Sequence, residues 1–153
     1  MRLLKSSHEE ADTRMVLHAI HSTCDKIVVY ARDTDVFLLL LHHFTKINCK
    51  ELWLMAGTAK KRKFFPVHKV FQLLEPEIIQ SILAFHASTG CDTTSYIAGH
   101  TRHSAWKVLQ HHSELLKDLG NVPLTDSIMD SVETFFCGIY NVKRCDSIDE
   151  ARR

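Results

Sequence analysis

Acidic residues occur in three short clusters, each where a helix or a strand is expected to begin or end. The clusters are Glu9, Glu10 and Asp12, then Asp33 and Asp35, then Asp92. Carboxylate oxygens are the ligands that hard divalent cations such as Mg²⁺ prefer, often together with substrate phosphates. Two such ions can activate a water molecule and stabilise the leaving oxygen of a phosphodiester. Clusters that converge on one pocket would therefore form a site that depends on Mg²⁺ or Mn²⁺.

Each cluster also has a purely structural explanation. Glu9 and Glu10 in a first helical turn are favoured by the helix dipole. Asp33 can be a helix N-cap, which contributes about 1 kcal/mol, and Asp92 can close a turn after Gly90. This alternative explains every cluster singly, but it gives no reason for all of them to occur together.

The elements that must position these carboxylates follow from the spacing of apolar residues. The pattern predicts helices over residues 8–23 and 35–44, strands over 26–31 and 51–56, and helices from residues 66 and 76, the second running until residue 90. Further helices are expected over 105–111, 115–119 and 125–136. Strands that alternate with helices predict a parallel sheet, and the first strand suits a central position in it. Ligand sites of such sheets lie outside the carboxyl ends of the strands, where Asp33 and Asp35 fall.

The bulk composition is that of an ordinary globular domain. The 153 residues are 45% apolar and 24% charged, and the net charge of +1 gives no overall attraction to nucleic acid or to a membrane. The basic run from Lys60 to Lys63 is the exception. It can contact a phosphate backbone, or it can be a solvated turn between two elements. Phe64 and Phe65 beside it can stack on bases, although core packing is the commoner fate of phenylalanine.

Cysteine usage and hydropathy indicate the compartment. The five cysteines are odd in number and widely spaced, so the sequence predicts no disulfide framework and a reducing, intracellular environment, in the nucleus or the cytoplasm. The longest apolar run, Val36 to Leu41, is too short to cross a bilayer. No membrane partner is therefore expected, and the oligomeric state is not predicted.

Two groups of histidine and cysteine offer zinc as a weaker alternative. They are His18, His21 and Cys24, and His42, His43 and Cys49. Structural zinc sites use four nitrogen or sulfur ligands at tight spacing, and no second pair lies near either group. Magnesium or manganese is therefore the metal that the sequence favours.

The order of the motifs resembles a known family. Glu10-Ala11-Asp12, Asp33-Thr34-Asp35 after an apolar strand, Gly90-Cys91-Asp92 and the stretch from Ile97 to Ala105 resemble the internal domain of flap-endonuclease-like nucleases of the PIN-like fold. The similarity covers roughly residues 7–112. The stretch from His8 to Arg14 is further similar to uncharacterised, transposon-associated animal proteins of this group.

This resemblance implies a fold and a function. The implied fold is α/β, with a PIN-like parallel sheet core over residues 7–92 and a helix-hairpin-helix-like helical region over 93–142, together one structural unit. The implied function is metal-dependent hydrolysis of nucleic acid, with DNA favoured over RNA. By position, the catalytic and metal-ligating residues would be Glu10, Asp12, Asp33, Asp35 and Asp92. The substrate backbone would be held by Lys60, Lys61, Arg62, Gly99, Thr101 and Arg102.

The chain also departs from the family pattern. A strand with an early aspartate should precede residue 7, so the resemblance implies a chain that is incomplete at its N-terminus. Thr101 replaces the second glycine of the hairpin motif, at a position that prefers an unusual backbone conformation. Thr93 replaces a tyrosine. A second hypothesis is therefore a catalytically inactive PIN-like module that serves as an interaction platform for nucleic acid or protein.

Overall fold

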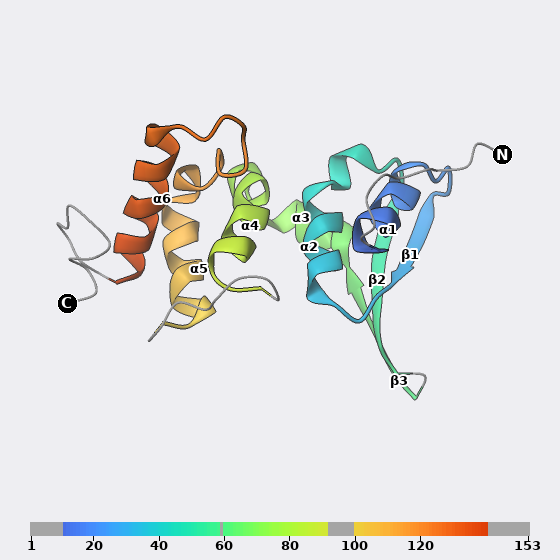
Figure 1. Ribbon diagram of the computed structural model, residues 1–153. Coiled ribbons are helices and arrows are strands. Elements are labelled where there is room, and N and C mark those ends of the chain that lie inside the picture. The colour runs from blue at the N-terminus through green and yellow to red at the C-terminus, as the bar shows by residue number, and fades with distance from the viewer. Residues whose placement is uncertain (1–10, 59, 92–99, 141–153) are drawn as a thin grey trace. The chain divides into compact units, whose positions relative to one another are not determined.

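The computed structural model describes residues 11–58, 60–91 and 100–140. It divides the chain into two compact units, Met1–Glu75 and Pro76–Arg153. The sequence predicted one structural unit instead. Within it, a boundary was expected at residue 92, after the helix that starts at Pro76. The first unit contains α1 (Ala11–Ile20), β1 (Lys26–Tyr30), α2 (Thr34–His42), the 3₁₀-helix η1 (Phe44–Lys46), β2 (Glu51–Thr58), β3 (Lys61–Pro66) and α3 (Val67–Leu73) (Figure 1).

The described part of the first unit contains one mixed three-stranded sheet in the order β1-β2-β3. Strand β1 pairs with β2 in parallel, as predicted, whereas β2 and β3 form an antiparallel hairpin. Only two residues separate β2 from β3, which is too short for a parallel crossover. The sequence favoured a turn over Lys60 to Lys63 and an extended stretch from Lys63 to Phe65. The structure leaves Lys60 in the turn and begins the strand at Lys61.

One face of this sheet packs against helices and contains the core of the unit. Side chains alternate between the two faces of a strand, and in β2 the buried residues are Leu52 and Leu54. The ring of Phe65, which is paired with Leu54, lies 6.5 Å from the ring of Phe37 on α2. Helix α2 therefore covers this face, where Leu40 is fully buried.

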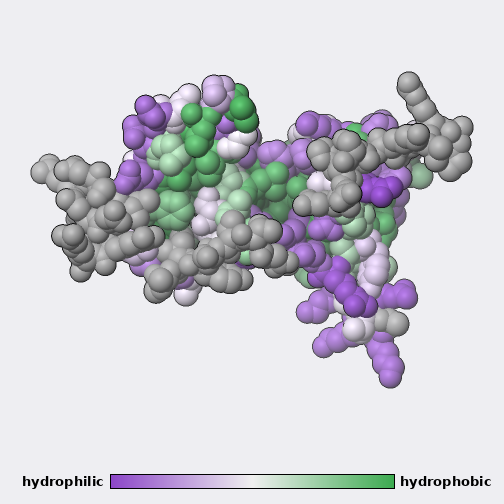
Figure 2. All heavy atoms as spheres, viewed as in Figure 1, coloured by the Kyte–Doolittle hydropathy of each residue, from purple (hydrophilic) through white to green (hydrophobic). Residues whose placement is uncertain are grey.

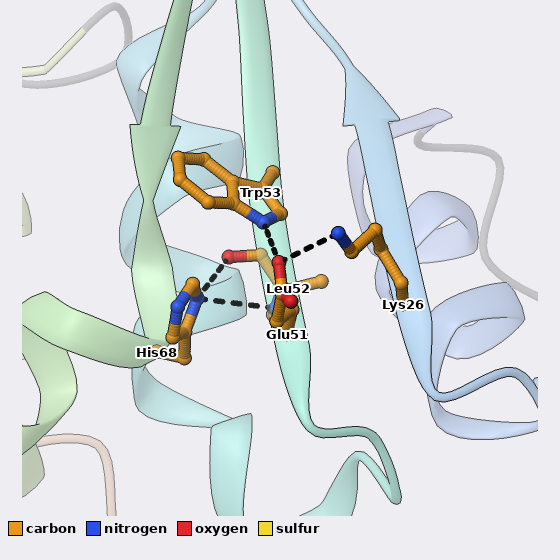
Figure 3. Close-up of polar contacts among 5 residues, drawn as sticks. All are labelled: Lys26, Glu51, Leu52, Trp53 and His68. Carbon is orange, nitrogen blue, oxygen red and sulfur yellow. Dashed lines mark hydrogen bonds and ion pairs between the residues drawn. The ribbon is translucent and has the colours of Figure 1, made fainter.

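His68 on α3 satisfies the backbone of β2 where β3 stops. Strand β3 ends at Pro66, opposite Trp53, so Leu52 has no partner residue in β3. The Nδ1 atom of buried His68 lies 2.9 Å from the Leu52 carbonyl oxygen and 3.3 Å from its amide nitrogen (Figure 3). Depending on the tautomer of the ring, Nδ1 donates a hydrogen bond to the Leu52 carbonyl oxygen or accepts one from the Leu52 amide. A side chain thus replaces a strand partner at this point.

The regular elements in the described residues of the second unit are all helices. It contains α4 (Pro76–Ser88), α5 (Arg102–His111), the 3₁₀-helix η2 (Ser113–Leu115) and α6 (Asp126–Ile139). Phe135 is fully buried, and Phe85 packs edge-on against it with ring centroids 6.4 Å apart. The helices predicted from residues 76, 105 and 125 are present. The predicted helix over 115–119 is absent: the structure has the 3₁₀-helix at Ser113–Leu115 and turns over the residues that follow it.

Two further expectations concern membranes and cysteines. Within the described ranges, no helix has the length and apolar character needed to cross a membrane. Cys24, Cys49 and Cys91 form no disulfide bond. The sequence predicted no disulfide framework and a reducing environment, and neither expectation accounts for Cys137, which is disulfide-bonded.

Candidate nucleic-acid interface

The two carboxylates after β1 lie at the carboxyl edge of the sheet, as the sequence predicted. Asp33 is the N-cap of α2, with extended backbone angles (φ −89°, ψ 141°), and its Oδ1 accepts a hydrogen bond from the Asp35 amide at 3.0 Å. Asp33 is exposed and Asp35 is half-buried. The structural explanation of Asp33 as a cap is therefore confirmed, and the cap also fixes its position at this edge.

The β2–β3 hairpin projects from the same edge. Tyr30, the last residue of β1, pairs with Met55, and β2 continues for three more residues to Thr58 before the chain turns. The end of the hairpin therefore extends beyond β1 on the side where Asp33 follows (Figure 1). The carboxyl edge of a parallel strand pair is the usual place for ligands in α/β proteins.

The projecting end carries the basic run. Lys60, Lys61, Arg62 and Lys63 are all exposed, and residues at this end are strongly hydrophilic (Figure 2). None of them forms an ion pair with a carboxylate of the described residues. Because their charges are not neutralised locally, they create a positive region at the carboxyl edge that attracts polyanions.

The other predicted metal ligands do not join this edge within the described residues. Asp12 lies in the first turn of α1 and is half-buried, while Glu10 and Asp92 fall outside the described residues. In the part of the chain that the structure describes, no three His, Cys, Asp or Glu side chains gather to hold a metal ion, and this includes both histidine–cysteine groups considered for zinc. Asp33 and Asp35 are the acidic pair at this edge.

Two predicted phosphate-contacting residues in the second unit make structural contacts. Thr101 is the N-cap of α5, and its Oγ1 accepts a hydrogen bond from the Ser104 amide at 3.2 Å. Its φ of −92° is ordinary, so the expected strain of threonine at a glycine position was wrong. The guanidinium of Arg102 donates to the Gly90 carbonyl. Gly99 lies outside the described residues.

Sequence reasoning missed the second face of the sheet, here called the open face. Its apolar members are Val28 and Tyr30 on β1, Trp53 and Met55 on β2, and Phe64 on β3, as the strand pairing and alternation show. Val28, Tyr30 and Phe64 are 50%, 48% and 52% exposed. A central parallel strand would be buried on both faces. The apolar run from Ile27 to Tyr30 favoured that position, but in the described structure β1 pairs only with β2.

Polar contacts fix two of these aromatic side chains. The hydroxyl of Tyr30 donates to the Gly57 carbonyl at 3.3 Å. Tyr30 also raises the pKa of the nearby Arg32 guanidinium. On β2, the indole Nε1 of Trp53 donates to Oε2 of Glu51 at 2.9 Å, and the same oxygen lies 3.1 Å from Lys26 Nζ (Figure 3).

The pKa of Glu51 gives a direct check of the Trp53 contact. It lies below its ordinary value of 4.5, chiefly because Trp53 donates to the carboxylate and then because Lys26 lies beside it. We expect Trp53→Phe, which removes the donor, to raise the pKa toward the ordinary value, as measured by NMR titration of the Glu51 carboxyl carbon. A lowered carboxyl pKa contributes stability that is fully present above the unfolded pKa and is lost as the pH falls through the folded pKa. The variant should therefore lose less stability than the wild type as the pH falls below 4.5.

The matched variant for this test is Lys26→Gln, which removes the ion pair and keeps the indole. It should also raise the pKa of Glu51, because Lys26 lowers that pKa both as a hydrogen-bond donor and as a neighbouring charge. A rise in Lys26→Gln with none in Trp53→Phe would show that the ion pair, and not Trp53, controls this carboxylate.

Comparisons with known proteins gave no match. No family model matches the chain, no curated protein is similar to it, and no solved structure matches it.

Proposed function

We propose that the first unit binds nucleic acid by holding the phosphodiester backbone at the carboxyl edge of its sheet. One observation carries this proposal: four consecutive exposed cations, without carboxylate partners among the described residues, lie on a hairpin that projects from that edge. We propose the nucleus or the cytoplasm as the compartment in which this binding takes place.

The physical basis is the counterion atmosphere of nucleic acid. A protein cation that neutralises a phosphate releases a condensed counterion, so each contact adds affinity without reading the base sequence. Surface lysines paired with carboxylates would contribute less, because their charge is already balanced. Lys50, which lies 2.6 Å from the Asp25 carboxylate, is an example of a balanced cation in the same unit.

A second candidate function, metal-dependent hydrolysis of the bound strand, is favoured by the position of Asp33 and Asp35. These carboxylates follow the parallel strand at the edge that carries the hairpin. Magnesium commonly binds one or two protein carboxylates together with substrate phosphates, so this pair fits a Mg²⁺ or Mn²⁺ ion that would activate water. The resemblance to PIN-like, flap-endonuclease-like nucleases supports the same role, with Glu10 and Asp92, which fall outside the described residues, as further ligands.

If this second function is present, Asp33 and Asp35 would hold the ion, and the hairpin cations would hold the backbone beside it. Asp35 is half-buried, which restricts its side chain. The Asp33 side chain is held by the hydrogen bond that it accepts from the Asp35 amide. Both carboxylates are therefore oriented before substrate binds, which reduces the cost of assembling a site.

One set of measurements tests both functions. Binding is measured by fluorescence anisotropy with labelled single-stranded and duplex DNA in EDTA, and cleavage by gel electrophoresis with MgCl₂ or MnCl₂. The double variant Asp33→Asn/Asp35→Asn should reduce cleavage by at least about a hundredfold while binding persists. Asparagine remains a good N-cap, so α2 should stay intact in this variant.

The control is Asp130→Asn, which changes an exposed carboxylate on α6 in the second unit. It should leave both binding and cleavage unchanged. Binding without cleavage in the wild type would leave the binding function and remove the catalytic one. A chain that binds neither form of DNA, nor RNA of the same length, would overturn the proposed function.

A further inference from the structure

The open face of the sheet presents its aromatic side chains in an ordered array. Tyr30 and Phe64 each pair directly with Met55, so these three side chains form one row across the three strands. Trp53 and Val28 form the adjoining row. Neighbouring strands are about 4.8 Å apart and rows on one face about 7 Å apart. The aromatic groups are therefore separated by distances that let flat ligands occupy them one at a time.

Tyr30 is held across the sheet. Its hydroxyl donates to the carbonyl of Gly57, two residues beyond its partner Met55. Although it is anchored at its polar end, the residue remains 48% exposed. A ring that is fixed and exposed loses little conformational entropy when a ligand stacks on it.

The charges around the array are complementary to a polyanion. Arg62 alternates with Lys61 and Lys63 along β3 and therefore shares a face with Phe64, two residues on. Arg32, which is exposed and follows Tyr30 by two residues, adds a second guanidinium. Glu51 also lies on this face by register, but Lys26 neutralises its carboxylate. Exposed aromatic rings beside exposed guanidinium groups are the combination that binds bases and phosphates together.

We propose that the open face binds single-stranded nucleic acid, with unpaired bases stacked on Tyr30, Phe64 and Trp53 and the backbone directed toward Arg32 and Arg62. This inference rests on the proposed function and specifies its substrate class. Bases in a duplex are already stacked on their neighbours, so a flat array of separate aromatic groups selects strands whose bases are free. The hairpin cations serve any nucleic acid, whereas the open face distinguishes single strands from duplexes.

The test uses the full chain with the substitution Trp106→Phe, which leaves Trp53 as the single tryptophan. A short oligothymidylate should quench Trp53 fluorescence, and a duplex of equal length should not. Phe64→Leu and Tyr30→Leu keep an apolar side chain on the strand but remove the ring. Each should weaken oligothymidylate binding by roughly five- to a hundredfold, the range for loss of one stacked base, and should leave duplex affinity unchanged.

Two further variants make the result specific. Phe64→Tyr keeps an aromatic ring and should retain the affinity of the parent chain. Met129→Ala removes a side chain on α6 that is 50% exposed, close to the 52% of Phe64, and should have no effect. Because aromatic groups carry no charge, the salt dependence of binding should be the same in Phe64→Leu as in the parent.

The outcomes separate this inference from the proposed function. If single strands and duplexes bind equally and the ring substitutions change nothing, the inference is wrong while the proposed function stands. Concentration-dependent self-association in sedimentation, lost in Phe64→Leu, would show that a second copy covers the open face and would also overturn the inference. If no nucleic acid binds at all, both the inference and the proposed function are wrong.

Discussion

Replacing Lys61, Arg62 and Lys63 with glutamine should weaken nucleic-acid binding roughly a hundredfold at 0.1 M salt. Each phosphate contact to a single strand contributes about 0.7 to the slope of log affinity against log salt, which amounts to about fivefold per cation at that concentration. Three cations therefore lower the slope by about 2. The measurement is anisotropy titration across a series of salt concentrations, with the wild type and the variant compared at each.

The control for this variant keeps the same change in net charge. Lys69, Lys107 and Lys117 are exposed lysines outside the hairpin, and their joint replacement by glutamine should leave most of the affinity and the slope intact. Thermal stability of the hairpin variant should be unchanged, because the three cations form no ion pair with described carboxylates. An equal loss of affinity in both variants would mean that net charge alone, and not the hairpin, governs binding.

The parts of the fold that were predictable are those in which local pattern and tertiary environment agree. Helix α2 has apolar residues nearly all round and an aspartate before it, and it is largely buried with Asp33 as its cap. Helices α4 and α6 begin at Pro76 and just after Thr125, whose side chain caps α6. In each case the start residue and the apolar spacing are encoded within one short stretch.

Strand β3 could not be predicted in the same way. Charged residues are weak strand formers on their own, and three of the six residues of β3 are basic. The strand exists because its backbone pairs with β2 over the whole stretch from Trp53 to Thr58. The tight turn after Thr58 brings β3 beside β2, and the strand propensity of residues 61–66 alone does not predict that pairing.

The candidate site was predictable at one edge only. Asp33 and Asp35 lie where the alternation of strand and helix placed them, and the basic run lies beside them. The sequence offered Phe64 as a stacking residue, but the array was missed because its members come from three strands, and Tyr30 and Phe64 become neighbours of Met55 only through register. Within the sequence Tyr30 and Met55 resemble ordinary core residues.

Substituting Gly57 should cost more stability than any other single change at the hairpin. Its φ is +103°, and a Cβ placed there would lie 2.3 Å from the carbonyl oxygen of Lys61, a backbone atom. A positive φ alone costs about 1–2 kcal/mol for alanine, and the collision forces β3 to move away from β2. We expect Gly57→Ala to lower the free energy of unfolding of the first unit by more than about 2 kcal/mol.

Gly120→Ala supplies the matched comparison, because Gly120 has a φ of +105° and nothing lies within 4 Å of the added Cβ. It should show the backbone strain without the collision, about 1 kcal/mol. Urea unfolding followed by Trp53 fluorescence, with Trp106→Phe in the background, reports the first unit. Trp106 fluorescence, with Trp53→Phe in the background, reports the unit that contains Gly120.

The effect of Gly57→Ala should extend to function, since the same residue positions both parts of the interface. Its carbonyl accepts the hydrogen bond from Tyr30, and its neighbour across the hairpin is Arg62. A shift of β3 therefore displaces the basic run and releases the Tyr30 ring at once. Nucleic-acid affinity should fall in Gly57→Ala under conditions where the variant is still folded, and it should be unchanged in Gly120→Ala. Equal stability losses in the two variants, or full affinity in Gly57→Ala, would mean that the hairpin geometry does not present the binding groups.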